Sequence, residues 1–245
     1  MRSRPPTGLA LDLGSSRIRL CTPAQRRPLD IPPVPGPPLV SRGRIVDVRG
    51  AAGVLAEVLA ELRITRAQLT VVATTPVLCG DAHREDVRTL MAEAGAATVV
   101  MIEGVKAAAL GAGMDLSEPL LVADVGAQLT EIALLAEGAV VEARRTLLGL
   151  HDRVPAAVLV EVIGDAVLEL LRGERGPQVA DALDRGVLLA GGGGLRPEIT
   201  YKLGRRLGIV VGPAPAPHTV AVRGAASVVH ATGRHPGVSR RTFPG

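Results

Sequence analysis

The chain has 245 residues, of which 47% are hydrophobic and only 1% aromatic, and its formal net charge is +4. That length is sufficient for one large or two small domains with buried cores, and no apolar run reaches the about 18–20 residues of a membrane-spanning helix. Residues 1–6 are basic but lead into a strand-like run, which is not the pattern of a signal peptide. Cys21 and Cys79 have neither metal-binding spacing nor a disulfide framework, so composition favours a cytoplasmic protein.

The positive charge is spread along the chain rather than massed. Arginine supplies nearly all of it, in short pairs such as Arg26-Arg27 and Arg205-Arg206 that lie far apart in the sequence. One Phe and one Tyr are too few aromatic rings for stacking on bases. We therefore expect no nucleic-acid partner.

The first predicted unit is a hairpin, with a strand over 8–13, a turn of small residues and a strand over 18–21. Residues 23–38 are rich in proline, which interrupts sheets and helices, so a linker or surface loop is expected there. Apolar residues at three-to-four spacing predict a helix over 51–62. Farther along, strands are expected over 69–74, 99–102, 120–125, 131–135, 140–144, 187–189 and 209–211, and helices over 81–94 (capped by Asp81), 105–110, 155–171, 197–207 and 220–231. Residues 234–245 are polar and expected to fray.

This alternation of strands and helices predicts an α/β fold with mostly parallel sheets. The chain also repeats a short pattern, because an apolar strand runs into Asp12-Leu13-Gly14 and a hairpin in the first half, and into Asp124-Val125-Gly126 and a hairpin in the second. Two such units predict two similar domains that face one another. A chance match of so short a pattern is the alternative.

Both Asp-x-Gly turns have a composition suited to phosphate. Glycine lets backbone N–H groups approach a phosphate closely, Ser15 and Ser16 add hydroxyl donors, and the carboxylate of Asp12 or Asp124 suits a hydrated magnesium ion. Two turns from opposite domains would hold one polyphosphate from both sides. The alternative is that they are ordinary hairpin turns, in which Asp is favoured for turn chemistry.

Four consecutive glycines, residues 191–194, stand between a predicted strand and a predicted helix. Glycine at such a place permits close contact with a flat ligand, or with a phosphate at a helix N-terminus. A flexible connection is the alternative, although four glycines after a buried strand cost conformational entropy.

Taken in order, these motifs resemble those of the sugar kinase, heat-shock chaperone and actin superfamily, and within it those of the bacterial MreB/Mbl family. Residues 11–16 (LDLGSS) are similar to the first phosphate motif, and residues 121–126 (LVADVG) with 130–133 (TEIA) to the second. Residues 186–193 (GVLLAGGG) are similar to the adenosine motif. The segments 84–95, 102–103 and 107–113 and the tail 217–225 (PHTVAVRGA) resemble MreB in particular.

The resemblance implies two actin-like (ribonuclease H-like) core subdomains with mixed sheets flanked by helices. We expect the first over residues 1–114, the second over 115–232 and a flexible tail over 233–245. The two outer subdomains of the family have no counterpart in the sequence: only the proline-rich residues 23–38 stand in place of one, and the chain runs from Leu148-Gly149 directly towards the helix at 155 where the other is expected. The chain thus resembles a truncated MreB.

The resemblance also implies a site for ATP and Mg²⁺. The predicted nucleotide-binding residues are Asp12, Gly14, Ser15, Ser16, Gly126, Gly191, Gly192 and Gly193, and Asp12 and Asp124 are predicted to hold Mg²⁺ through water. Asp124 is also a candidate catalytic residue, as is Glu103, but the position that matches the catalytic glutamate of the family is Gly104. Ala127 and Gln128 replace family glycines and are expected to crowd a β-phosphate. At most a weak ATPase is therefore expected.

By this resemblance the protein is a nucleotide-binding cytoskeletal subunit involved in bacterial cell shape and cell-wall organisation. Its expected partners are itself, full-length MreB-type filament subunits and cell-wall morphogenesis proteins. It would lie in the cytoplasm, at the inner face of the membrane only through partners, because residues 1–7 lack an amphipathic or apolar character. The alternative is a degenerate, non-hydrolysing interaction module that regulates MreB-type filaments or another wall protein. A small-molecule kinase or phosphatase of the same fold ranks last, because no acceptor base stands out.

Overall fold

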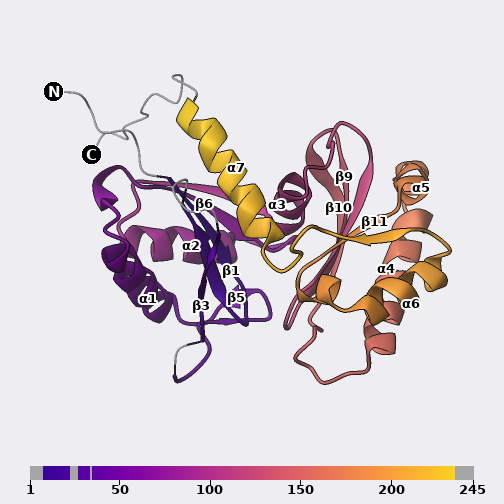
Figure 1. The fold of residues 1–245 in the computed structure, drawn as a ribbon, viewed down its shortest axis with the longest axis horizontal. Helices are drawn as coiled ribbons and strands as arrows, with labels where there is room; N and C mark the ends of the chain where they lie inside the picture. The colour runs from indigo at the N-terminus through magenta and orange to yellow at the C-terminus, as the bar shows by residue number, and fades with distance from the viewer. Residues whose placement is uncertain (1–7, 23–26, 34, 235–245) are drawn as a thin grey trace.

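The structure is a computed structural model that describes residues 8–22, 27–33 and 35–234. Two five-stranded mixed sheets lie side by side, with two helices between them (Figure 1). The first sheet has the order β3-β2-β1-β6-β7, with β1 (Gly8–Leu13), β2 (Ile18–Cys21), β3 (Leu29–Ile31), β6 (Thr70–Thr75) and β7 (Thr98–Glu103). The second has the order β10-β9-β8-β11-β12, with β8 (Leu120–Val125), β9 (Thr130–Ala136), β10 (Ala139–Thr146), β11 (Val187–Ala190) and β12 (Val211–Pro213).

The two sheets repeat one topology. In each, the first strand is central, pairs antiparallel with the next strand of its hairpin, and pairs parallel with a later strand on its other side. The register repeats as well, because Asp12 lies opposite Arg19 in one hairpin and Asp124 lies opposite Glu131 in the other. The repeat predicted from the sequence is therefore present, in mixed rather than mostly parallel sheets.

Helices cover the outer faces of the two sheets (Figure 1). The first half has α1 (Val48–Glu61) and α2 (Asp81–Glu93), and the second has α4 (Ala156–Arg172), α5 (Gly176–Arg185) and α6 (Pro197–Leu207). Aliphatic side chains and Met91 fill these layers. Those from α1, α2 and the first sheet form one buried cluster, and those from α4, α5, α6 and the second sheet form another.

The remaining helices, α3 (Gly104–Gly111) and α7 (Val220–Arg234), lie between the sheets. The sequence prediction assigns α7 to the second subdomain, yet its Val222 and Ala225 pack with Ala10 and Val72 of the first sheet. The two helices cross so closely that a Cβ atom on Gly224 would lie 1.7 Å from the carbonyl oxygen of Ala107. The contact between the halves thus includes two helices whose backbones touch.

Several elements differ from the sequence predictions. The proline-rich stretch includes β3, which forms at the edge of its sheet and pairs only with β2, where flanking prolines are tolerated. It is followed by a short hairpin, β4 (Val40–Ser41) and β5 (Arg44–Ile45), that was not predicted. Helix α5 was also missed, and Gly80 rather than Asp81 is the N-cap of α2. The predictions for residues 1–7 and 235–245 lie outside the described residues.

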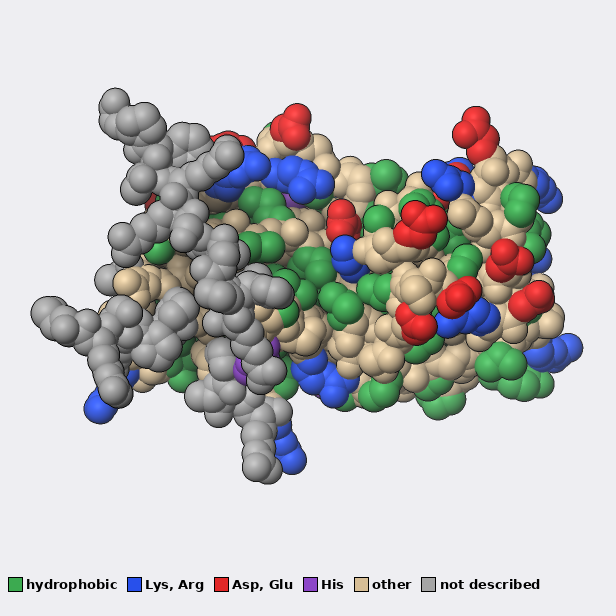
Figure 2. Space-filling view, turned by 90° about the horizontal axis from the view of Figure 1, so that it is seen from above, with side chains coloured by type: hydrophobic (Ala, Val, Ile, Leu, Met, Phe, Trp, Pro, Cys, Tyr) green, Lys and Arg blue, Asp and Glu red, His purple; other side chains and the backbone are tan. Residues whose placement is uncertain are grey.

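No helix in the described part of the chain is long and apolar enough to cross a membrane. On the face of the molecule shown in Figure 2, acidic and basic side chains are interspersed. Several exposed charges are paired, among them Arg206, whose guanidinium lies 2.9 Å from a carboxylate oxygen of Glu161 and 2.7 Å from one of Asp165. Such exposed pairs contribute little to stability.

Candidate functional site

The two Asp-x-Gly turns open onto one cavity of about 210 Å³ between the halves. Most of the predicted nucleotide-binding residues line this cavity: Asp12, Gly14, Ser15, Ser16, Asp124, Gly126, Gly191 and Gly192. Gly193 does not line it and is instead buried against the side chain of Val125. The structure therefore brings together residues that the sequence separates by more than a hundred positions.

Asp12 is held by two neighbours that the sequence analysis did not identify. The Thr74 hydroxyl donates a hydrogen bond to Asp12 Oδ1 at 2.7 Å, and the Arg19 guanidinium lies 3.6 Å from Asp12 Oδ2. Arg19 also lies 2.9 Å from a carboxylate oxygen of Asp30. Arg19 stands opposite Asp12 in the hairpin register, so a register drawn from the sequence would have found it, whereas Thr74 comes from the neighbouring parallel strand.

On the opposite side of the cavity, Asp124 and Glu131 are a close acidic pair. Burial, and then the charge of Asp12, raises the pKa of Asp124 to about 7. Burial, and then the charge of Asp124, raises the pKa of Glu131 to about 8, although the Val77 N–H donates to Glu131 Oε1 at 2.6 Å. Desolvation disfavours the ionised form of a carboxyl group. At neutral pH and without a bound cation, Glu131 is therefore mostly protonated and Asp124 is partly protonated. Glu131 was not among the predicted site residues.

The glycines of residues 191–194 are closely packed rather than flexible. Gly191 has φ of +72°, and a Cβ atom there would lie 2.2 Å from Asp124 Oδ1. A Cβ on Gly194 would meet the ring of Pro217 at 2.6 Å, and the Gly191 N–H donates to the Pro217 carbonyl at 3.0 Å. Only glycine allows the end of β11 to lie directly against Asp124. The glycines thus shape one wall of the cavity.

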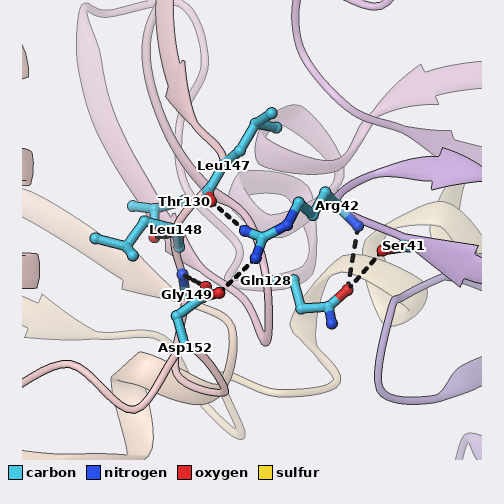
Figure 3. A network of polar contacts seen from close by, with 8 residues as sticks. All are labelled: Ser41, Arg42, Gln128, Thr130, Leu147, Leu148, Gly149 and Asp152. Atoms are coloured by element: carbon cyan, nitrogen blue, oxygen red, sulfur yellow. Dashed lines mark hydrogen bonds and ion pairs between the residues drawn. The ribbon is translucent and has the colours of Figure 1, made fainter.

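The turn after β8 keeps free donors beside the cavity. The Gly126 N–H donates to the Leu129 carbonyl at 2.8 Å and closes the turn. Within the described residues, no hydrogen bond uses the N–H groups of Ala127 and Gln128. The Gln128 carboxamide oxygen accepts hydrogen bonds from the Ser41 hydroxyl at 3.3 Å and from the Arg42 N–H at 3.2 Å (Figure 3). Its side chain is therefore engaged by the opposite half. Ala127 and Gln128 both line the cavity, so the crowding of a phosphate by these side chains stays a prediction.

The chain matches the family model described as MreB/Mbl protein over residues 37–152. This segment includes the turn after β8, Asp124 and the first-half hairpin that meets it. The chain has an actin-like fold, and this segment of it is similar to the MreB/Mbl family. No curated protein sequence matches it.

Solved structures share the fold of this MreB-like chain. MreB5 of Spiroplasma citri bound to ADP has a TM-score of 0.77 and 16% identity, with 94% of this chain and 98% of that chain covered. The same protein bound to AMPPNP has a TM-score of 0.78 and 15% identity, with 94% and 97% covered. The ethanolamine utilization protein EutJ from Carboxydothermus hydrogenoformans has a TM-score of 0.64 and 20% identity, with 92% and 91% covered.

The MreB-like chain lacks a carboxylate at one cavity position. Gly104, at the start of α3, lines the cavity, whereas its neighbour Glu103, the second catalytic candidate from the sequence, does not. Among the described residues outside its own helix, the Thr75 carbonyl oxygen alone lies within 4 Å of a Cβ atom built on Gly104, at 3.8 Å. The cavity therefore has room for a side chain at position 104, although the sequence provides none.

Proposed function

We propose that this protein binds ATP with Mg²⁺ in the cleft between its halves and acts as an MreB-like cytoskeletal subunit in bacterial cell shape and cell-wall organisation. The observation that carries the proposal is the pair of Asp-x-Gly turns, at equivalent positions of two repeated sheets, that open onto one cavity. The MreB5 structures of the same fold hold ADP and AMPPNP, which supports a nucleotide as the ligand.

Each group at the cavity suits part of such a ligand. Ser15 and Ser16 and the free N–H groups of Ala127 and Gln128 are donors for phosphate oxygens. Asp12 and Asp124 suit a magnesium ion that keeps several waters.

The cavity volume of about 210 Å³ is below the ~300–1,000 Å³ of typical ligand pockets. A cavity of this size suits the phosphate chain and the magnesium ion, and the rest of the nucleotide extends beyond the cavity. Bound Mg²⁺ would supply charge that favours the ionised carboxylates of Asp12 and Asp124. A pKa of about 7 places Asp124 in the range in which a carboxyl group exchanges protons at neutral pH.

Nucleotide binding is tested by thermal unfolding with and without Mg²⁺-ATP. Because a ligand at 100 times its dissociation constant adds about 2.7 kcal/mol to the free energy of unfolding, the wild-type protein is expected to melt several degrees higher with the ligand. Asp12→Asn, which keeps the shape of the side chain and removes its charge, is expected to lose the Mg²⁺-dependent shift. Asp181→Ala, an exposed change on α5, is the control and should retain it. No shift in the wild-type protein at millimolar ATP would contradict nucleotide binding and leave the fold as an interaction scaffold.

The cytoskeletal role is tested by co-sedimentation of the protein, alone and with full-length MreB, in the presence of Mg²⁺-ATP. We propose that it assembles with itself or with such filaments in the cytoplasm and reaches the membrane and wall proteins through them. Pelleting that depends on nucleotide is the expected result. A protein that stays in the supernatant in both mixtures contradicts this role even if ATP binds.

Hydrolysis is expected to be slow because position 104 provides no general base. Gly104→Glu is expected to raise the rate of phosphate release by about 10²-fold, which is the lower end of the effect of a positioned acid or base. Gly104→Gln is the control, since it adds the same bulk without a carboxylate. Equal rates for both variants, measured in single-turnover experiments, would show that the missing carboxylate does not limit hydrolysis.

A further inference from the structure

A short hairpin reaches across the cleft from the first half to the second. Its strands β4 and β5 are joined by the two-residue turn Arg42-Gly43, with φ of +48° and +72°. Its base is fixed in the first half, because Val40 and Ile45 are buried and the Val46 N–H donates to the Leu39 carbonyl at 2.8 Å. The tip of the hairpin is therefore held by an anchored base.

The tip places an arginine where the backbone favours other residues. Two-residue hairpin turns with positive φ at both positions are adopted most easily by Asn-Gly and Asp-Gly, and an arginine with positive φ is uncommon. What Arg42 adds to the turn is its guanidinium group. That group donates to the Leu147 carbonyl and to Asp152 Oδ1, the latter at 2.6 Å (Figure 3). Both acceptors belong to the second half.

The residues that receive Arg42 are tied to the turn after β8. The Leu150 N–H donates to the Gly126 carbonyl at 3.0 Å, and the His151 N–H donates to the Ala127 carbonyl at 2.8 Å. Asp152 accepts a second hydrogen bond from the Gly149 N–H at 2.8 Å, and a Cβ on Gly149 would lie 2.5 Å from the backbone of Ala127. The loop 147–152 and the turn 126–129 therefore behave as one packed unit.

We propose that Ser41, Arg42, Gln128 and Asp152 form a clasp that holds the two halves closed over the cleft, and that Arg42 is its principal link. The hairpin holds this unit at two points: Ser41 and the Arg42 N–H bind Gln128, and the Arg42 side chain binds Leu147 and Asp152. Hydrogen bonds between ionised partners are about twice as strong as neutral ones. The Arg42 guanidinium also lowers the pKa of Asp152, so this link persists throughout the neutral range.

This clasp gives the cleft a closed state that the chain maintains by itself. Because Gly43 in the same tip packs against Pro76 of the first half and Leu129 of the second, opening requires the polar links and this apolar contact to break together. A ligand that needs more room than the present cavity enters after the clasp releases. The proposal concerns closure of the halves, and it stands whether or not the ligand is a nucleotide.

The test is Arg42→Asn, studied by hydrogen–deuterium exchange of the full chain without nucleotide. The change creates a favoured turn sequence and removes only the guanidinium, so the hairpin should remain intact, with unchanged exchange at Val46. Amides in the loop 147–152, Leu150 and His151 among them, are expected to exchange about tenfold faster, since a hydrogen bond to a charged group is lost. Arg44→Asn is the matched control: within the described part of the chain the Arg44 side chain has no hydrogen bond or ion pair, and the exchange pattern of this variant should equal that of the wild type.

A second variant separates the clasp from an effect of Arg42 on its own hairpin. Asp152→Asn is expected to raise exchange in the same loop, and the double variant Arg42→Asn/Asp152→Asn should exchange no faster than the more affected single variant, because both act on one link. Unchanged exchange over 147–152 in Arg42→Asn would overturn the proposal. Faster exchange confined to the hairpin would overturn it as well, since it would show a role in the turn alone.

Discussion

Gly224→Val is expected to lower the free energy of unfolding by about 3 kcal/mol or more, the upper range for side chains forced into a packed interface. A Cβ on Gly224 would lie 1.7 Å from the Ala107 carbonyl oxygen, and one on Gly111 would lie 2.0 Å from the Val220 carbonyl oxygen. Both contacts are with backbone, which cannot rotate away as a flexible side chain can. Helices α3 and α7 would have to separate, and the contact between the halves would weaken with them. Urea unfolding followed by circular dichroism measures the change.

A glycine with open space around it provides the control. Gly53 lies within α1, and no atom lies within 4 Å of a Cβ atom built on it. Gly53→Ala is therefore expected to raise the free energy of unfolding by about 0.5–1 kcal/mol, as alanine does in helices. If Gly224→Val unfolds at the same urea concentration as the wild type, the close crossing of α3 and α7 is wrong.

The free energy of unfolding without nucleotide is expected to fall by roughly 6 kcal/mol between pH 5 and pH 8, since each pKa unit corresponds to about 1.4 kcal/mol. The pKa of Glu131 is raised to about 8 and that of Asp124 to about 7, from ordinary values of 4.5 and 3.8. Over this range the native state therefore holds protons that the unfolded chain has released. Stability then decreases as pH rises and levels off above about pH 9, where the buried carboxyl groups are ionised in both states.

Glu131→Gln isolates one of the two groups. Its carboxamide oxygen can still accept from the Val77 N–H, so the packing should survive while the titration disappears. In this variant the free energy of unfolding is expected to fall by about half as much between pH 5 and pH 8 as in the wild type. The variant is also expected to be more stable than the wild type above pH 8. Glu93→Gln, an exposed change on α2, should leave the pH profile as it is. A wild-type stability that rises from pH 5 to pH 8 would contradict the raised pKa values.

Glu131 and the clasp join the halves at separate places. The Val77 N–H, in the loop after β6, donates to Glu131, and the Arg145 guanidinium donates to the Val77 carbonyl at 3.2 Å. Ionisation of Glu131 puts a buried charge at this contact, whereas the Arg42 link lies at the more exposed tip of the hairpin. Alkaline pH and loss of Arg42 are therefore expected to loosen the same interface by different means.

The sequence alone located the main elements and the two halves of the site. Strands β1, β2 and β8 and helix α6 end where predicted, because turn residues or helix-boundary residues such as Pro197 and Gly208 flank them. Asp12 and Asp124 were predictable because an Asp-x-Gly turn is a local feature. Helix α5 was not predicted, because it is short and only Val179 and Ala182 among its aliphatic side chains are fully buried.

Only the tertiary structure decided how the halves meet. The Arg42–Asp152 contact joins residues 110 positions apart, and the Thr74–Asp12 contact joins residues 62 apart. No local pattern encodes such pairs, because they depend on how α3 and α7 cross and on how the two sheets pack around them. The raised pKa values of Asp124 and Glu131 have the same origin, since burial between the halves causes them. The sequence determined the two Asp-x-Gly turns, and packing determined the cavity that they share and the raised pKa values beside it.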